Sequence, residues 1–379
     1  MEFTSRTFKD ILEKHDNIFG RKTVLLGGDF RQTLPIVTRG TRNDVVNASI
    51  NKSYLWEQCR VFLLNKNMRL SSNEMSSVRR NEIAEFGEWV LQLGEGRILM
   101  IALSENEEPQ WIEIPPEILL EPGKKPIEEI IKSTYPNLDS EYANIDYMKD
   151  RCILTPMNDD VEEVNATVMS QIPTTAKVYR SADSLSQMSG YTEEQEMLHP
   201  VEYLNTLKAS GIPNHLIELK IGVPVMLTRN IDPSNGLCNG TRLIILEMKS
   251  KTLHAQIVTG SHVGKKVTIH RIITTSRPTQ WEFMLRRIQF PIKMCFAMTI
   301  NKSQGQTLNH VGIYLPRPTF SHGQLYVAVS RVTSKRGLKI MIARKEEEPA
   351  GYTRNIVYRE VFTDLPTGDA EDATNNTNG

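Results

Sequence analysis

The sequence predicts an α/β fold built on a parallel β-sheet, and residues 311–342 carry the strongest observations for it. The apolar run VGIYL (311–315) has the length and branching of a buried strand. SHGQLYVAVSRV (321–332) has apolar residues at helical spacing, and the apolar run LKIMI (338–342) follows a Lys-Arg-Gly helix stop. A strand, a helix and a strand joined by short links form a βαβ unit, whose strands pair in parallel and bind ligands at their carboxyl ends.

Further segments fit the same class. Residues 152–169 are predicted to form a strand and then a helix with acidic residues in its first turn. Other expected helices cover 8–20 (ending at Gly20), part of 41–58, 78–93 and a stretch near 200–209, and other expected buried strands lie in 22–37 and 59–64.

The character of the sequence changes between residues 219 and 275. Short apolar runs alternate there with SNG, CNG and GS turns. Closely spaced short strands with glycine turns predict a small β-barrel.

Charge is unevenly distributed, although the formal net charge of the 379 residues is zero. Residues 71–150 contain 17 acidic and 7 basic side chains, whereas residues 251–345 contain 16 basic side chains and one acidic residue, Glu282. So basic a segment favours a polyanionic partner such as nucleic acid. A solvated basic face is the alternative interpretation.

Several classes of protein are disfavoured. The four cysteines (Cys59, Cys152, Cys238 and Cys295) include no CxxC pair, so neither a zinc site nor a disulfide framework is predicted. No stretch of 18 uninterrupted apolar residues and no secretion signal occur, which predicts an intracellular protein without membrane contact. The polar tail 363–379 is expected to be disordered, and we expect a monomer.

The loop NKSQGQT (301–307) groups a lysine, two hydroxyls, the amides of Gln304 and Gln306, and a glycine. This composition suits a phosphate site, and a polar surface turn is the alternative. Arg331 closes the predicted helix 321–332. There it could act on a phosphate or simply stabilise the helix end by its charge.

These residues resemble a known family. TINKSQGQTL and GQLYVAVSR are similar to the last two signature motifs of superfamily-one DNA helicases, in the petite integration frequency (PIF) branch and its Helitron-type relatives. GGDFRQTLPIV (27–37) resembles the third motif, although a single proline replaces the usual pair. LNKNMRL (64–70) resembles the fourth motif, and GLCNGTR (236–242) resembles an Asn-Gly turn of the family's inserted barrel.

The resemblance implies roles for particular residues. Gln32 would sense the terminal phosphate of ATP, and Arg69 and Arg331 would reach that phosphate from a second RecA-like domain. The residues implied in nucleotide binding are Asp29, Gln304, Gly305 and Gln324. Those implied in contact with single-stranded DNA or duplex junctions are Thr299, Lys302, Ser303, Lys265, Lys266 and Arg271, and no protein metal ligand is implied.

The resemblance also implies a domain organisation. Residues 1–64 would be the C-terminal part of a first RecA-like domain. Residues 65–220 and 276–345 would form the second RecA-like domain, and 221–275 would form an inserted SH3-like β-barrel.

The phosphate-binding motif GxxxxGK[ST] does not occur in these 379 residues, and no Asp-Glu pair precedes GGDF. In the family both lie upstream, so the ligands of Mg²⁺ are expected in an upstream segment. The implied activity is ATP-dependent 5′-to-3′ DNA unwinding in repair, recombination and telomere or genome maintenance, in the nucleus or mitochondrion. We expect this chain alone to hydrolyse ATP feebly. The alternatives are a single-stranded DNA-binding remnant without hydrolysis and a RecA-like structural protein without either ligand.

Overall fold

The structure is a computed structural model that describes residues 1–70, 76–186, 199–209, 211–276, 281–343, 348–363, 365 and 366, without the side chain of Arg69. The chain divides into two compact units. Unit 1 comprises Met1–Pro115, Pro318–Lys335 and Glu348–Gly379, and unit 2 comprises Pro116–Arg317 and Arg336–Glu347. Domain boundaries predicted from the sequence stay predictions.

Unit 1 is built around the long helix α3 (Ser77–Gly94). The Ser76 hydroxyl caps this helix by accepting a hydrogen bond from the Arg79 N–H. Its buried face contains Ile83, Phe86, Val90 and Leu93, so the helix predicted over 78–93 is confirmed. The short helix α10 (Gln324–Val329) packs against α3. Strands β1 (Trp111–Glu113) and β17 (Tyr352–Arg354) pair antiparallel in the same unit.

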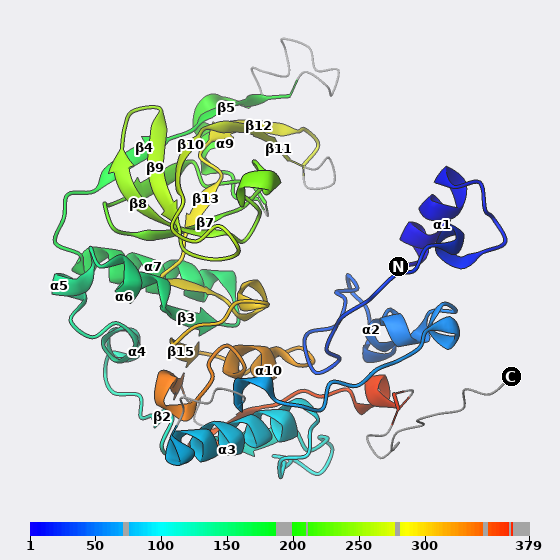
Figure 1. Cartoon of the computed structure of the whole chain (residues 1–379). Helices are drawn as coiled ribbons and strands as arrows, with labels where there is room; N and C mark the ends of the chain where they lie inside the picture. Colours follow the sequence, from blue (N-terminus) through cyan, green and yellow to red (C-terminus); the bar gives the residue numbers. More distant parts are fainter. Residues whose placement is uncertain are drawn as a thin grey trace, which may run out of the picture. The chain divides into compact units, whose positions relative to one another are not determined.

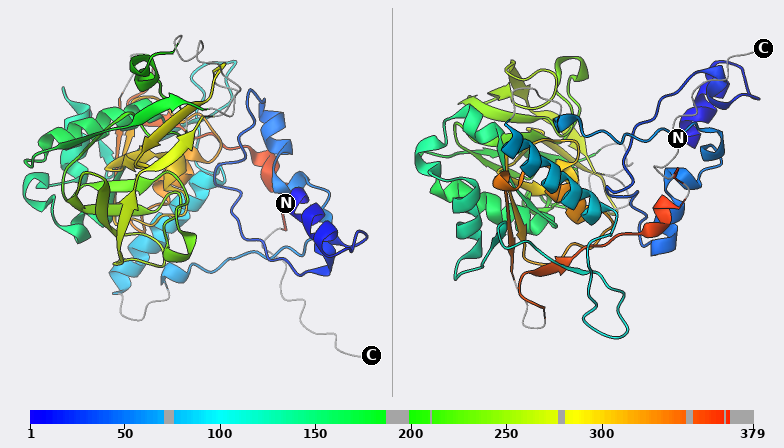
Figure 2. Two further views of the ribbon diagram at one scale, coloured as in Figure 1. Left: turned by 90° about the horizontal axis from the view of Figure 1, so that it is seen from above. Right: turned by 60° about the horizontal axis from the view of Figure 1, so that its bottom comes forward.

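The first 70 residues are less regular than predicted. In Figures 1 and 2 this stretch, drawn in blue, consists of short helices joined by long irregular segments. Its helices are α1 (Glu2–Ile11), α2 (Arg42–Asn47) and the 3₁₀ turns η1 (Ile18–Arg21), η2 (Ile50–Lys52), η3 (Trp56–Gln58) and η4 (Met68–Leu70). The prediction of a helix over 8–20 is wrong, because α1 ends before Glu13, whose positive φ of 52° interrupts helical backbone.

The buried strands predicted in 22–37 and 59–64 are also wrong. Neither segment contains a strand, and Leu25 and Leu64 are 92% and 98% exposed. A strand is stable when neighbouring strands satisfy its backbone N–H and C=O groups. No strand in the described part of the chain pairs with either segment.

The central element of unit 2 is a parallel sheet with the strand order β14-β3-β15-β16-β2. Its strands are β14 (Ala297–Thr299), β3 (Arg151–Thr155), β15 (His310–Leu315), β16 (Leu338–Ile342) and β2 (Leu119–Leu120). The parallel pairing of β15 with β16 confirms the sheet predicted from residues 311–342. The intervening helix α10 is shorter than the predicted 321–332, because Gly323 at its start has a left-handed φ of +67°.

Helices α4 (Pro126–Thr134) and α7 (Asn158–Gln171) contact this sheet. The predicted strand-helix pair in 152–169 is thereby confirmed. A glycine is required at position 312, since a Cβ atom there would come within 2.1 Å of the Thr134 hydroxyl oxygen on α4. The remaining helices of unit 2 are α5 (Leu138–Glu141), α6 (Ile145–Lys149) and α9 (Val201–Thr206), the last of which lies in the stretch predicted near 200–209.

Antiparallel strands form the rest of unit 2. One five-stranded sheet has the order β10-β9-β8-β7-β13, with β10 (Lys266–His270), β9 (Thr252–Ile257), β8 (Arg242–Met248), β7 (Pro224–Leu227) and β13 (Ile292–Met294). Smaller sheets combine β11 (Ile272–Thr275), β12 (Leu285–Gln289) and β5 (Ala182–Leu185), and β4 (Lys177–Arg180) with β6 (Leu216–Leu219). The hydrogen-bonded order of the large sheet is open at β10 and β13, and its closure into an SH3-like barrel stays a prediction.

The parallel sheet and the five-stranded antiparallel sheet of unit 2 share one hydrophobic core. Arg242 at the start of β8 is fully buried there, and its guanidinium donates to the carbonyl oxygens of Lys149 at 3.0 Å and Arg151 at 2.9 Å. In the described part of the chain, no helix is both long and apolar enough to cross a bilayer. Most of the tail predicted to be disordered, from residue 367 on, lies outside the described residues.

Candidate functional site

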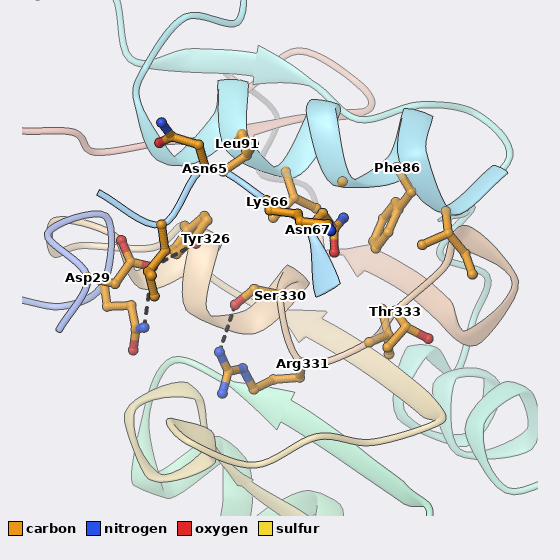
Figure 3. A pocket seen from close by; sticks show the side chains of 16 residues that line it. Asp29, Asn65, Lys66, Asn67, Phe86, Leu91, Tyr326, Ser330, Arg331 and Thr333 are labelled. Atoms are coloured by element: carbon orange, nitrogen blue, oxygen red, sulfur yellow. Dashed lines mark hydrogen bonds between the residues drawn. The ribbon is translucent and has the colours of Figure 1, made fainter. Parts of the chain in front are cut away.

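Unit 1 contains a cavity of about 350 Å³ formed by four segments of the chain. Figure 3 shows the side chains that line it. They come from the turn Asp29–Gln32, from the segment before η4, from α3, and from α10 and the residues just after it. The lining residues are Asp29, Gln32, Leu64, Asn65, Lys66, Asn67, Ile83, Phe86, Gly87, Val90, Leu91, Tyr326, Ser330, Arg331, Val332 and Thr333.

The cavity has an apolar wall and a polar rim. Phe86 and Val90, both buried on α3, belong to the apolar wall. Lys66, its neighbouring asparagines and Arg331 contribute cationic and hydrogen-bonding groups. An apolar surface with a few converging polar groups is the usual composition of a small-molecule site, and cations with amides are suited to phosphate oxygens.

Asp29 organises the turn beside the cavity. Its Oδ1 atom accepts hydrogen bonds from Arg31 Nε at 2.8 Å and from the Arg31 backbone N–H at 3.1 Å. Its Oδ2 atom accepts the Tyr326 hydroxyl at 2.8 Å and Gln32 Nε2 at 3.4 Å. Burial by itself raises the pKa of Asp29, but the Arg31 charge and these hydrogen bonds outweigh it and hold the pKa below its ordinary value. Asp29 is therefore a carboxylate that ties the turn to α10.

Two glycines permit this close approach. A Cβ atom at Gly94, in the last turn of α3, would come within 2.5 Å of Tyr326 Cδ2. A Cβ atom at Gly323 would come within 2.2 Å of the Arg31 carbonyl oxygen, and its φ of +67° also favours glycine. The backbone of the turn, α3 and α10 can pack together because these positions carry no side chain.

Arg331 lies one residue beyond the C-cap of α10 and is only 7% exposed. Its Nε atom donates to the Val327 carbonyl oxygen at 2.8 Å, and its Nη2 atom donates to the Ser330 hydroxyl at 2.8 Å (Figure 3). These contacts orient the guanidinium where it lines the cavity and also satisfy the last turn of the helix.

The structure brings together part of the predicted set. Gln32, Arg331 and Asp29 line the same cavity, although Arg331 is distant in the chain from the other two. Arg69 belongs to η4, directly after the lining segment 64–67, and its side chain lies outside the described residues. Gln324 is buried and its Oε1 atom accepts the Phe320 N–H at 3.0 Å, so this amide supports the start of α10.

The other predicted residues belong to unit 2. Thr299 ends β14 at the carboxyl edge of the parallel sheet, and the 3₁₀ turn η7 (Ile300–Ser303) follows. Lys302 is exposed there, whereas Ser303 is fully buried and its hydroxyl donates to the Ile300 carbonyl oxygen at 2.7 Å. Gln304 and Gly305 are exposed, and Gly305 has a φ of +79°. In this structure Lys302 therefore presents its charge to solvent while Ser303 stabilises the turn.

The basic residues of the antiparallel region differ in their surroundings. Lys266 is exposed on β10, and Lys265 is also exposed but donates to Asn235 Oδ1 at 2.5 Å. Arg271 donates to the Arg180 carbonyl oxygen at 2.5 Å, and its guanidinium lies 5.1 Å from the centre of the Phe290 ring. Arg271 thus has a structural role irrespective of any ligand.

Sequence reasoning missed Tyr326 and the polar segment Asn65 to Asn67. Tyr326 lies inside GQLYVAVSR, where its apolar ring counts as core and its hydroxyl has no visible partner in the sequence. The asparagines and Lys66 lie two to four residues before Arg69. Their polarity just after the apolar run 59–64 is the signal that could have identified them.

The described residues do not match a magnesium site. Asp29 is the carboxylate that lines the cavity, and both its oxygens already accept hydrogen bonds from Arg31 and Tyr326. Within the described ranges, no group of three or more His, Cys, Asp or Glu residues could hold a metal ion. Mg²⁺ usually needs free carboxylate oxygens in addition to substrate phosphates.

Comparisons with known proteins agree with these features. Residues 1–102 match the family described as PIF1-like helicase, and residues 202–248 match the family described as DNA helicase Pif1, 2B domain. The ATP-dependent DNA helicase PIF1 of Danio rerio is 33% identical over 190 residues, which cover 48% of this chain and 26% of the relative. The ATP-dependent DNA helicase Pif1 of Bdellovibrio bacteriovorus is 31% identical over 189 residues, covering 50% of this chain and 38% of the relative.

Two solved structures show the same fold. The Pif1 helicase of Candida albicans superposes with a TM-score of 0.58 at 20% identity, covering 95% of this chain and 72% of that one. The Bacteroides Pif1 helicase in complex with ADP-AlF3 and ssDNA superposes with a TM-score of 0.57 at 17% identity, covering 93% and 73%. The predicted RecA-like α/β fold is thereby confirmed. The matched region is only about a quarter of the length of the vertebrate relative from Danio rerio.

Proposed function

We propose, from the relation of this chain to the PIF1-type helicases of superfamily one, that it is part of an ATP-dependent DNA helicase. The observation that supports this most directly is the shared cavity of unit 1, which Gln32 and Arg331 line together. These two residues come from separate signature motifs. A helicase needs such a pair because hydrolysis of ATP must be sensed and transmitted to DNA.

Arg331 is proposed to stabilise the negative charge that develops on the terminal phosphate of ATP. Arginines in this role contribute on the order of 10³ to 10⁵ in rate, or about 4 to 7 kcal/mol. Arg69 is proposed to assist from the segment next to the cavity, and Gln32 to sense the same phosphate. Asp29 would act by holding the turn that carries Gln32, while Gln304, Gly305 and Gln324 stay predicted nucleotide-binding residues.

DNA is the proposed second ligand. Exposed Lys302, next to Thr299 at the carboxyl edge of the parallel sheet, supports contact with a single strand. Lys265 and Lys266 would add phosphate contacts, with Ser303 and Arg271 supporting their loops. Binding to duplex junctions, 5′-to-3′ polarity, a monomeric state, a nuclear location and roles in repair, recombination and telomere or genome maintenance are proposed from the resemblance.

The chain alone is proposed to turn over ATP only feebly. Phosphoryl transfer depends on a phosphate cradle as well as on arginines, and the GxxxxGK[ST] motif does not occur in this sequence. A test should therefore measure nucleotide discrimination, which requires only binding.

The experiment titrates the purified chain with fluorescent analogues of ATP and ADP. Arg331→Ala should weaken binding of the ATP analogue more than that of the ADP analogue, because the guanidinium would face the additional phosphate. Arg331→Lys should keep part of this preference by retaining the charge. The matched control is Arg79→Ala on the exposed part of α3. An equal loss for both nucleotides, or no loss, would contradict the proposed role.

Single-stranded DNA binding is measured in parallel at increasing salt. Phosphate contacts release counterions, so affinity should fall steeply as salt rises. The absence of binding at low salt would exclude DNA as a ligand. DNA binding without any nucleotide binding would instead favour the single-stranded DNA-binding remnant.

A further inference from the structure

His322, a buried residue just before α10, connects two segments of unit 1. It is 2% exposed. Its Nε2 atom lies 2.8 Å from the Phe30 carbonyl oxygen, and its Nδ1 atom lies 2.8 Å from the Tyr358 backbone nitrogen. A carbonyl oxygen can only accept and an amide N–H can only donate, so Nε2 must carry the proton and Nδ1 must accept. His322 is therefore a neutral imidazole in a single tautomer, with both nitrogens engaged.

One end of this connection is the turn beside the cavity. Phe30 lies between Asp29 and Arg31, and the turn closes where the Gln32 N–H donates to the Asp29 carbonyl oxygen at 3.1 Å. The Phe30 ring packs edge-on against Trp56, with centroids 5.7 Å apart. His322 thus holds the backbone of this turn, whereas Tyr326 holds its carboxylate.

The other end is the segment 355–362, which follows β17. Other parts of unit 1 hold this segment in place. Asn355 Nδ2 donates to the Leu93 carbonyl oxygen at 2.8 Å, and Arg359 Nη2 donates to that of Gly96 at 2.6 Å. Asn51 Nδ2 donates to the Val361 carbonyl oxygen at 3.0 Å, and Arg42 forms an ion pair with Glu360 at 2.9 Å. The His322 ring also stacks on Tyr358, with centroids 5.4 Å apart. The segment is therefore a fixed support for His322.

We propose that His322 is a positioning residue for the turn Asp29–Gln32. The segment 355–362 holds His322 in place and so supports the cavity indirectly. The importance of this for nucleotide binding rests on the function proposed above. The positioning itself does not, because it concerns hydrogen bonds inside unit 1.

The chemistry of the ring predicts how the connection responds to acid. A second proton would have to occupy Nδ1, where it would face the Tyr358 N–H and break that hydrogen bond. Burial lowers the pKa of His322 and Arg42 lowers it further, against the raising effects of the Phe30 carbonyl, Glu360 and Asp29. The connection is therefore complete above the ordinary histidine pKa of 6.5. Its contribution to stability is lost as the pH falls from that value toward the lowered pKa.

Amide hydrogen exchange on the full chain tests the positioning without any ligand. His322→Ala should accelerate exchange in peptides covering 29–32 and 356–359 by about tenfold each, the effect expected for the loss of one hydrogen bond to each segment. Strand β3 in unit 2 is the internal reference, and His15→Ala, at an exposed histidine of unit 1, is the matched control.

Two further variants separate the ends of the connection. His322→Gln keeps a donor near the position of Nε2 and should protect the turn while releasing the Tyr358 amide. His322→Asn keeps an acceptor near the position of Nδ1 and should do the reverse. Exchange in the turn that is unchanged in His322→Ala would overturn the proposal. If that variant does not fold, equal loosening of both peptides in the Gln and Asn variants would overturn it.

A titration with the ATP analogue at different pH values then tests whether this positioning affects nucleotide binding. The affinity of the wild type for the ATP analogue, relative to that of His322→Gln, should fall as the pH is lowered from 6.5 through the lowered pKa of folded His322, since only the wild type carries the titrating imidazole. A constant ratio across this range would exclude an effect on nucleotide binding. If the wild type binds no nucleotide at all, the proposed function fails, and the exchange arm alone decides the positioning.

Discussion

Replacing Gly94 by alanine should weaken the packing of α10 on α3, whereas the same replacement at Gly87 of the same helix should not. A Cβ atom at Gly94 would lie 2.5 Å from Tyr326 Cδ2, 2.8 Å from Tyr326 Cε2 and 3.0 Å from Arg31 Cβ. Among the described residues, a Cβ atom at Gly87 would meet only Asn67 Nδ2, at 3.2 Å, the end of an exposed side chain.

The expected magnitudes follow from these distances. Glycine to alanine inside a helix stabilises by about 1 kcal/mol, a gain that applies in full at Gly87 and in part at Gly94, the last residue of α3. At Gly94 the buried Tyr326 ring must move, and overpacking of this kind costs about 1 to 3 kcal/mol. The movement also strains the hydrogen bond from Tyr326 to the Asp29 carboxylate, a class of bond that contributes about 1.5 to 3 kcal/mol. We expect a net loss of about 2 kcal/mol for Gly94→Ala and a gain of up to about 1 kcal/mol for Gly87→Ala.

Urea unfolding of the two variants and the wild type, followed by tryptophan fluorescence, measures this difference. Trp89 on α3 is one of the fluorescent reporters. The urea midpoints of the three proteins are compared with one common slope of the free energy of unfolding against urea concentration. The reasoning is refuted if Gly94→Ala is as stable as the wild type, or if Gly87→Ala loses more stability than Gly94→Ala.

Three other predictions address the remaining features. Arg287→Met should lower the free energy of unfolding by about 3 to 5 kcal/mol in thermal or urea unfolding, because it leaves the buried Asp183 carboxylate without the guanidinium that donates to it at 2.6 Å. Lys302→Ala should reduce the slope of log affinity for single-stranded DNA against log salt by about 0.7 in anisotropy titrations, and an unchanged slope would remove Lys302 from the interface. Asp29→Asn should make the free energy of unfolding depend less on pH in the acid range. The lowered pKa of Asp29 contributes stability above its ordinary value of 3.8, and this is lost as the pH falls through the lowered value, so the wild type should lose more stability than the variant in acid unfolding.

The elements that sequence reasoning predicted correctly are those with complete local patterns. Helix α3 has its apolar face and its serine cap within one continuous stretch, and the apolar run of β16 directly follows a Lys-Arg-Gly helix stop. The predicted strands in 22–37 and 59–64 have comparable apolar runs and do not form. Their composition carried no information about whether another strand would lie beside them.

In the candidate site, too, some features could be predicted from the sequence and others could not. Gln32 and Arg331 could be selected from their motifs, and the structure places both on one cavity. Ser303 was selected by the same reasoning, but its hydroxyl is fully buried and bonded to Ile300. The pairing of Tyr326 with Asp29, and of His322 with Phe30 and Tyr358, could not be read from either motif alone.

The sequence by itself determined the α/β class, the order of the motifs, the basic character of residues 251–345 and the choice of Gln32 and Arg331, two of the polar residues that line the cavity. These depend on periodicity, spacing and charge, which are properties of neighbouring residues. Only the tertiary structure decided which strands pair, why glycine is needed at position 94 and how His322 joins the turn to the C-terminal segment. Each of these depends on atoms that are distant in the chain, and hydrogen bonding and close packing between them arise only when the folded backbone brings them together.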